Sequence, residues 1–148
     1  KYLKEKYVDF IEIYDSVSDS ILFNKIYPSS GIFVYPGFSD TFGFSLLEAM
    51  SFGIPIVTVN AFARKEIVEN GKNGFVIERP NDMSIYKIRE KERKVINELV
   101  EKTSILIESS SLRRKMGRYG RTLVEKGKFS IKERNKKLKE IYEMAVKN

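Results

Sequence analysis

Residues 40–57 have the sequence DTFGFSLLEAMSFGIPIV, in which Glu48 is the only charged residue after Asp40. The next charge along the chain is Arg64. The residues beside Glu48 are apolar, which predicts a largely buried helix from about Gly43 to Phe52. Burying an unpaired carboxylate is costly, so we expect Glu48 to have a partner, and we favour a ligand rich in hydroxyl groups.

Buried strands are predicted on both sides of this helix. Residues 31–35 form a continuous apolar run bounded by turn residues, which is typical of a strand covered on both faces, and residues 54–59 are predicted to form the next buried strand. Gly53 suits the left-handed position after the helix, and Pro55 cannot continue it. Because strands alternate with helices, we expect an α/β fold with a Rossmann-like, mainly parallel sheet and right-handed crossovers.

Weaker patterns complete this α/β part, which we place at residues 1–82. Alternating apolar residues predict a half-buried strand at 8–13, and a short helix should follow from 16–19 until Pro28 ends it. A helix at 64–69, a turn at 70–74 and a strand at 75–77 come next. The sheet should therefore have about four strands.

Residues 83–148 are predicted to form helices that pack on the same domain. Three amphipathic segments are expected at about 85–108, 110–125 and 130–146. In the last segment one face can be shared by five apolar residues, with lysines on the other. These five residues are Ile131, Leu138, Ile141, Tyr142 and Ala145.

Composition excludes several kinds of chemistry. The 148 residues are 42% hydrophobic and 32% charged, as in an ordinary soluble domain, and include neither cysteine nor histidine. Disulfides, thiolate metal sites and Ser-His-Asp or Cys-His catalysis are thereby excluded within the chain. No segment has the pattern of a membrane span or a secretion signal, so we expect a cytoplasmic protein, with peripheral attachment to a membrane surface as a further expectation.

A net charge of +7 indicates an acidic partner, and the excess of basic residues lies in the C-terminal third. Candidate partners are a phosphate-bearing small molecule and an anionic membrane surface, and a solvated helix face is the simplest alternative. A nucleic acid is not expected, because no aromatic platform or known nucleic-acid motif accompanies the basic residues.

The predicted loop after residue 35 and the helix that begins at Gly43 would lie at the carboxyl edge of the sheet, where α/β folds commonly hold ligands. Backbone amides of Gly43 and Phe44 can bind a phosphate or a sugar hydroxyl at the positive end of the helix dipole. Asp40 can accept hydrogen bonds from a sugar, and Glu48 can accept two from the hydroxyls of a ribose. Simple alternatives are an N-cap role for Asp40 and an ion pair of Glu48 with Arg64 or Lys65.

At these residues the chain resembles the group 1 nucleotide-sugar glycosyltransferases, retaining enzymes with the two-domain GT-B fold. The family's C-terminal domain carries a proline, an acid, Phe-Gly, Leu-Glu-Ala-Met and Gly-x-Pro-Val-Val at a fixed spacing. This chain matches with Pro36, Asp40, Phe42-Gly43, Leu47-Glu48-Ala49-Met50 and Gly53-Ile54-Pro55-Ile56-Val57. Later matches are Glu66-Ile67-Val68, Asn70-Gly71, Asn73-Gly74-Phe75-Val76-Ile77, Met116-Gly117 and Phe129-Ser130.

The resemblance implies that the chain is the donor-binding part of a hexosyltransferase that uses a UDP- or GDP-linked sugar, with no bound metal and no other cofactor. Glu48 would bind the donor ribose, main-chain groups would line the sugar and diphosphate, and Asp40 would contact the sugar as the catalytic-site acid. The implied donor contacts are Asp40, Phe42, Gly43, Phe44, Leu47 and Glu48.

The chain departs from the family at Asp40, where a glutamate is usual, and at residues 60–63, where a glycine pair is usual. The family's diphosphate-binding Arg and Lys, its acceptor domain and its first two strands would precede Lys1. We therefore expect an N-terminally incomplete domain that does not transfer sugar alone. An N-terminal acceptor domain, a second chain or a homo-oligomer is then an expected partner. Alternative functions are a non-catalytic nucleotide-sugar binding module and an epimerase on the same fold. After these comes a basic domain that binds a nucleic acid or a membrane surface.

Overall fold

The computed structural model describes residues 9–37, 42–79 and 88–147. Within them one parallel sheet is formed by β1 (Phe33–Tyr35), β2 (Ile56–Val59) and β3 (Gly74–Ile77), in the order β1-β2-β3. Val57 lies opposite Val34 on one side and Phe75 on the other. The predicted α/β class with a parallel sheet is confirmed.

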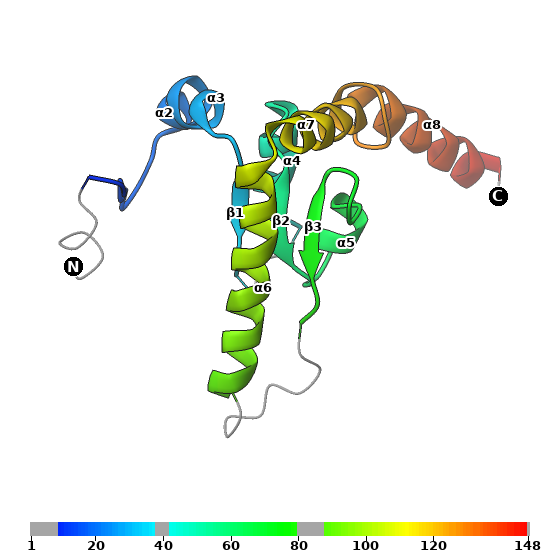
Figure 1. The fold of residues 1–148 in the computed structure, drawn as a ribbon. Coiled ribbons are helices and arrows are strands. Elements are labelled where there is room, and N and C mark those ends of the chain that lie inside the picture. The colour runs from blue at the N-terminus through cyan, green and yellow to red at the C-terminus, as the bar shows by residue number, and fades with distance from the viewer. Residues whose placement is uncertain (1–8, 38–41, 80–87, 148) are drawn as a thin grey trace.

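Alternate residues of β2 face two different helical layers, as the two-residue period of a strand requires. Val57 and Val59 pack against α6 (Ile88–Glu108), which runs along one face of the sheet (Figure 1). Ile56 packs with residues of α4 (Phe44–Ser51) and α5 (Arg64–Ile67) on the opposite face. The sheet is therefore the middle layer of three, and all four residues of β2 are buried.

The predicted C-terminal helices are α6, α7 (Ser110–Glu125) and α8 (Ile131–Lys147). Ser109 caps α7 by accepting a hydrogen bond from the amide of Leu112, and α7 packs on α4 and α6. In contrast, α8 extends away from the sheet (Figure 1). Its predicted apolar face is exposed in this structure, with Ile131 70% and Tyr142 67% accessible to solvent.

The first helical segment is more irregular than its sequence indicates. It comprises α2 (Asp19–Ile21), the π-helical turn η1 (Leu22–Ile26) and α3 (Tyr27–Ser29), and Ser18 caps its start. The π-turn widens the helix immediately before Pro28, where the proline ring would otherwise clash with a carbonyl one turn back. The helix consequently continues through Pro28 and ends at Ser29.

One of the predicted strands is absent from the described residues. Residues 9–13 form no strand and are exposed, and Val8 lies outside the described residues. Alternation of apolar residues produces a strand only where a neighbouring strand supplies hydrogen bonds, and 9–13 have none beside them among the described strands. The structure thus describes three strands where about four were expected.

β1 is also less covered than its apolar sequence suggests. Phe33 and Tyr35 are half-buried and Val34 is exposed, because β1 lies at the edge of the described sheet. The prediction of full coverage holds for β2, which has a strand on each side. The proposed division between residues 82 and 83 lies outside the described residues.

Candidate donor-binding site

The start of α4 lies beyond the carboxyl end of β1 and is opened by a glycine in a left-handed conformation. Gly43 has φ 91° and ψ 49°, and it is buried. This conformation is unfavourable for residues with a Cβ atom, which explains a glycine at this position. The amide of Leu46 in the first turn of α4 donates to the carbonyl of Gly43 at 3.0 Å. The amides of Phe44 and Ser45 have no partner in the described part of the chain and can bind an anion. Asp40, which was predicted to lie beside them, is outside the described residues.

Glu48 lies in the second turn of α4 and is half-buried. Its Oε2 atom accepts a hydrogen bond of 2.9 Å from the hydroxyl of Tyr27, in α3. Among the described residues Glu48 forms no ion pair, because Lys65 pairs with Glu78 at 2.7 Å and Arg64 donates to backbone carbonyls instead. The alternative of an ion pair with Arg64 or Lys65 is therefore not found among the described residues, and the side-chain partner of the Glu48 carboxylate there is the neutral hydroxyl of Tyr27.

The remaining predicted donor contacts have different environments. Phe42 and Phe44 are exposed by 36% and 68%, and their ring centroids lie 5.1 Å apart. Leu47 is half-buried and packs against the core between α4 and the sheet. The side chain of Leu47 is therefore used in packing, whereas the two phenylalanines lie at the surface beside Gly43.

Arg64 lies at the carboxyl edge of the sheet, where α4 also begins. Only 1% of its surface is exposed. Its Nη1 atom donates to the carbonyl oxygens of Gly37 and Val59, the latter at 3.2 Å. The guanidinium lies 4.6 Å from the ring centroid of Tyr35, a cation-π distance. The buried Nε and Nη2 atoms have no hydrogen-bond partner in the described part of the chain. A positive charge is thereby fixed at the carboxyl ends of β1 and β2.

Several C-terminal basic residues contact the fold itself. Arg113 donates to the last carbonyls of α6, including Ile107 at 2.7 Å. Lys128 lies 3.2 Å from a carboxylate oxygen of Glu69. These contacts give some of the excess basic residues a partner within the protein, so those residues require no external one.

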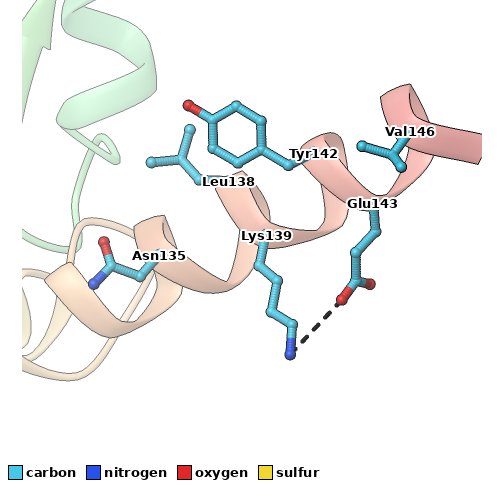
Figure 2. Close-up of a pocket in the computed structure, with 6 residues that line it drawn as sticks. All are labelled: Asn135, Leu138, Lys139, Tyr142, Glu143 and Val146. Atoms are coloured by element: carbon cyan, nitrogen blue, oxygen red, sulfur yellow. Dashed lines mark ion pairs between the residues drawn. The ribbon is translucent and has the colours of Figure 1, made fainter.

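A shallow hollow lies along α8, and Figure 2 shows the side chains that line it, with the ion pair between Lys139 and Glu143 at 3.7 Å. All of its lining residues belong to this one helix, so the hollow is an open surface separate from the site at α4. In the described ranges no group of three or more Asp and Glu residues is arranged to hold a metal ion. None of the helices described here has the length and apolarity of a membrane span.

Comparison with known proteins identifies the family. Residues 11–123 match the family described as "Glycosyl transferases group 1". The chain belongs to this family. The match includes β1, α4, β2 and β3 and ends near the end of α7. It therefore contains every element that forms the candidate site.

The glycosyltransferase chain is similar to proteins that are much longer than the aligned region. It is 35% identical to the capsular polysaccharide biosynthesis glycosyltransferase CapM of Staphylococcus aureus over 114 residues, which is 77% of the chain and 25% of the relative. It is 39% identical to a sucrose synthase of Solanum tuberosum over 42% of the chain and 8% of the relative. It is 43% identical to the O-antigen chain mannosyltransferase B of Escherichia coli over 39% of the chain and 14% of the relative.

Two residues of the candidate site lack the local sequence pattern that identifies the others. Tyr27 is separated from Glu48 by 21 positions, and nothing in the local pattern links them. Arg64 was considered only as an ion-pair partner of Glu48, yet it is the first charge after Glu48 in an otherwise uncharged stretch. Its place as the first charge after the buried strand is a usable signal, because an Arg that is buried is normally held by specific hydrogen bonds.

Proposed function

We propose that this chain binds the nucleotide sugar in a retaining hexosyltransferase, with UDP- or GDP-hexose as the donor. Glu48 carries the proposal. It is an acid on a helix of otherwise uncharged residues, and one of its oxygens, Oε1, has no hydrogen-bond partner in the described part of the chain. An ionised carboxylate accepts hydrogen bonds on both oxygens, so Glu48 can bind the vicinal hydroxyls of a ribose.

We assign the diphosphate and the sugar to the start of α4. The amides of Phe44 and Ser45, which have no partner among the described residues, and the helix dipole favour an anion, and Gly43 allows close approach of a ligand to the backbone. Phe42, Gly43 and Phe44 would contact the donor through main-chain groups. Asp40, outside the described residues, is proposed to contact sugar hydroxyls at the catalytic site.

The names of two relatives support a hexose as the transferred sugar. One is named a sucrose synthase and another an O-antigen chain mannosyltransferase. No metal is required in this proposal, because positive groups can stabilise a departing diphosphate electrostatically. Arg64 places one buried positive charge at the same sheet edge.

Calorimetric titration with UDP and GDP tests the proposal. The parent protein should bind one of the two nucleotides, and Glu48→Ala should weaken that binding by about 1.5–3 kcal/mol, on the order of 10- to 150-fold, because a charged hydrogen-bond acceptor is lost. Glu101→Ala is the matched control, since Glu101 is an exposed acid on α6. Equal nucleotide affinity in the parent and in Glu48→Ala would refute the proposed role.

A further inference from the structure

Tyr27 has a rigid setting at the start of α3. Only 3% of its surface is exposed, and it belongs to a small core with Ala49 and Ile54. Its ring stacks on Phe52 with centroids 5.3 Å apart and meets the edge of Phe23 at 5.6 Å. Since the ring is held on two sides, the position of its hydroxyl group is also fixed.

The hydroxyl of Tyr27 points to the carboxylate of Glu48, as the 2.9 Å hydrogen bond to Oε2 indicates. Oε1 accepts no hydrogen bond from any described residue. The carboxylate is thus held through one oxygen, while the other has no partner in the described part of the chain. Burial and the hydrogen bond to Glu48 raise the pKa of Tyr27 above its ordinary value. The hydroxyl therefore remains a donor throughout the neutral range.

A glutamate side chain has several rotatable bonds and loses rotamer freedom when a ligand immobilises it. A side chain that is already fixed in the free protein loses less, and its ligand binds more tightly. From this geometry we propose that Tyr27 is a positioning residue that holds the Glu48 carboxylate for the ribose hydroxyls of the donor. The inference rests on the proposed ribose-binding role of Glu48 and extends it to a residue that contacts no substrate.

Tyr27→Phe tests the inference, because it removes the hydroxyl and keeps the packed ring. The matched control is Tyr119→Phe, which removes a hydroxyl that donates to another carboxylate, Glu69, at the same distance of 2.9 Å. Affinities for UDP and GDP are measured by calorimetry together with those for 2′-deoxy-UDP and 2′-deoxy-GDP. Thermal unfolding of each variant establishes that it is folded.

For whichever nucleotide binds, Tyr27→Phe should weaken the affinity about three- to tenfold. It should also reduce the preference for the ribonucleotide over its 2′-deoxy counterpart, whereas a general structural defect would weaken both equally. Tyr119→Phe should change neither quantity. In a Glu48→Ala background, Tyr27→Phe should cause no further loss, because the group that it positions is absent.

The outcomes separate the two proposals. If Glu48→Ala weakens binding and Tyr27→Phe does not, the positioning role is overturned and the proposed function stands. If Tyr27→Phe weakens binding equally with and without Glu48, the hydroxyl does not act through the carboxylate, and the inference is also overturned. If Glu48→Ala leaves the affinity unchanged, the proposed function itself fails.

Discussion

A Cβ atom on Gly117 would overlap the carbonyl oxygen of Gly53, so the two backbones touch where α7 crosses the end of α4. Gly53 itself is in the left-handed conformation, with φ 72°, and turns the chain from α4 towards β2. No side chain intervenes between these two glycines. Helix α7 is therefore in direct backbone contact with the turn that follows α4, the helix that carries Glu48.

Gly117→Ala should destabilise the protein by about 2–3 kcal/mol, because the added methyl group meets backbone atoms that cannot rotate away. Urea denaturation measures this difference. Gly31→Ala is the control, since a Cβ at Gly31 meets no atom within 4 Å and should change stability by less than about 0.5 kcal/mol. Equal stability of the two variants would contradict the close contact.

Gly43→Ala should cost about 1–2 kcal/mol of stability, because alanine is strained at φ 91°. It should also weaken nucleotide binding more than about tenfold if the backbone of α4 contacts the donor. In contrast, Phe44→Ala should keep the nucleotide affinity within about twofold, since its side chain is exposed and the proposed contact uses the main chain. Calorimetry on both variants checks this, and a larger effect of Phe44→Ala would assign the contact to its ring.

Glu69 joins the turn before β3 to the C-terminal helices. The hydroxyl of Tyr119 donates to it at 2.9 Å, and Lys72 and Lys128 lie within 3.2 Å of its oxygens. The hydrogen bond from Tyr119 and the two lysines lower the pKa of Glu69 to about 2, against a smaller opposing effect of burial. A lowered pKa means that the ionised carboxylate stabilises the folded state above the ordinary glutamate range and that this contribution is lost as the pH falls towards 2.

Glu69→Gln should therefore lower the free energy of unfolding by about 1–2 kcal/mol at pH 7, after allowance for solvent screening. The difference between parent and variant should shrink between about pH 4.5 and pH 2. Urea denaturation at several pH values measures it. Glu125→Gln, which removes an exposed i,i+4 pair with Arg121, should cost less than about 0.5 kcal/mol. A pH-independent effect of Glu69→Gln would contradict the assigned ionisation.

Arg64→Met should destabilise the protein by about 2 kcal/mol, because the carbonyl oxygens of Gly37 and Val59 lose a charged donor. Lys65→Met is a control at the neighbouring position, where the side chain is half exposed and forms a surface ion pair with Glu78. It should change stability by less than about 0.5 kcal/mol. An Arg64→Met variant as stable as the parent would mean that replacing the buried charge by apolar packing offsets the lost hydrogen bonds.

The sequence predicts those parts of the fold whose signals are local. The helices at 88–108, 110–125 and 131–147 follow from long amphipathic segments, and α4 follows from an apolar run between two glycines. The prediction of a strand at 8–13 is wrong, because the alternation of apolar and polar residues does not reveal whether a neighbouring strand exists. The exposure of Val34 was missed for the same reason, since edge and central strands can carry similar apolar sequences.

The candidate site likewise contains some residues that the local sequence identifies and others that it does not. Gly43 and Glu48 were identifiable, because one must permit an unusual backbone conformation and the other is a charge in an apolar helix. Tyr27 and the buried setting of Arg64 depend on contacts between separate elements, which no local pattern encodes. The same holds for the contact of Gly53 with Gly117, which brings together residues 64 positions apart.

The position of β2 between β1 and β3 has a consequence for the dynamics of the chain. Both hydrogen-bonded ladders of the described sheet use residues 56–59, so separating β2 from its neighbours breaks all of that pairing at once. The amide protons of this strand should exchange with deuterium only when the whole domain opens, and they report its global unfolding free energy. Those of α8, whose side chains are largely exposed, should exchange first through local fraying.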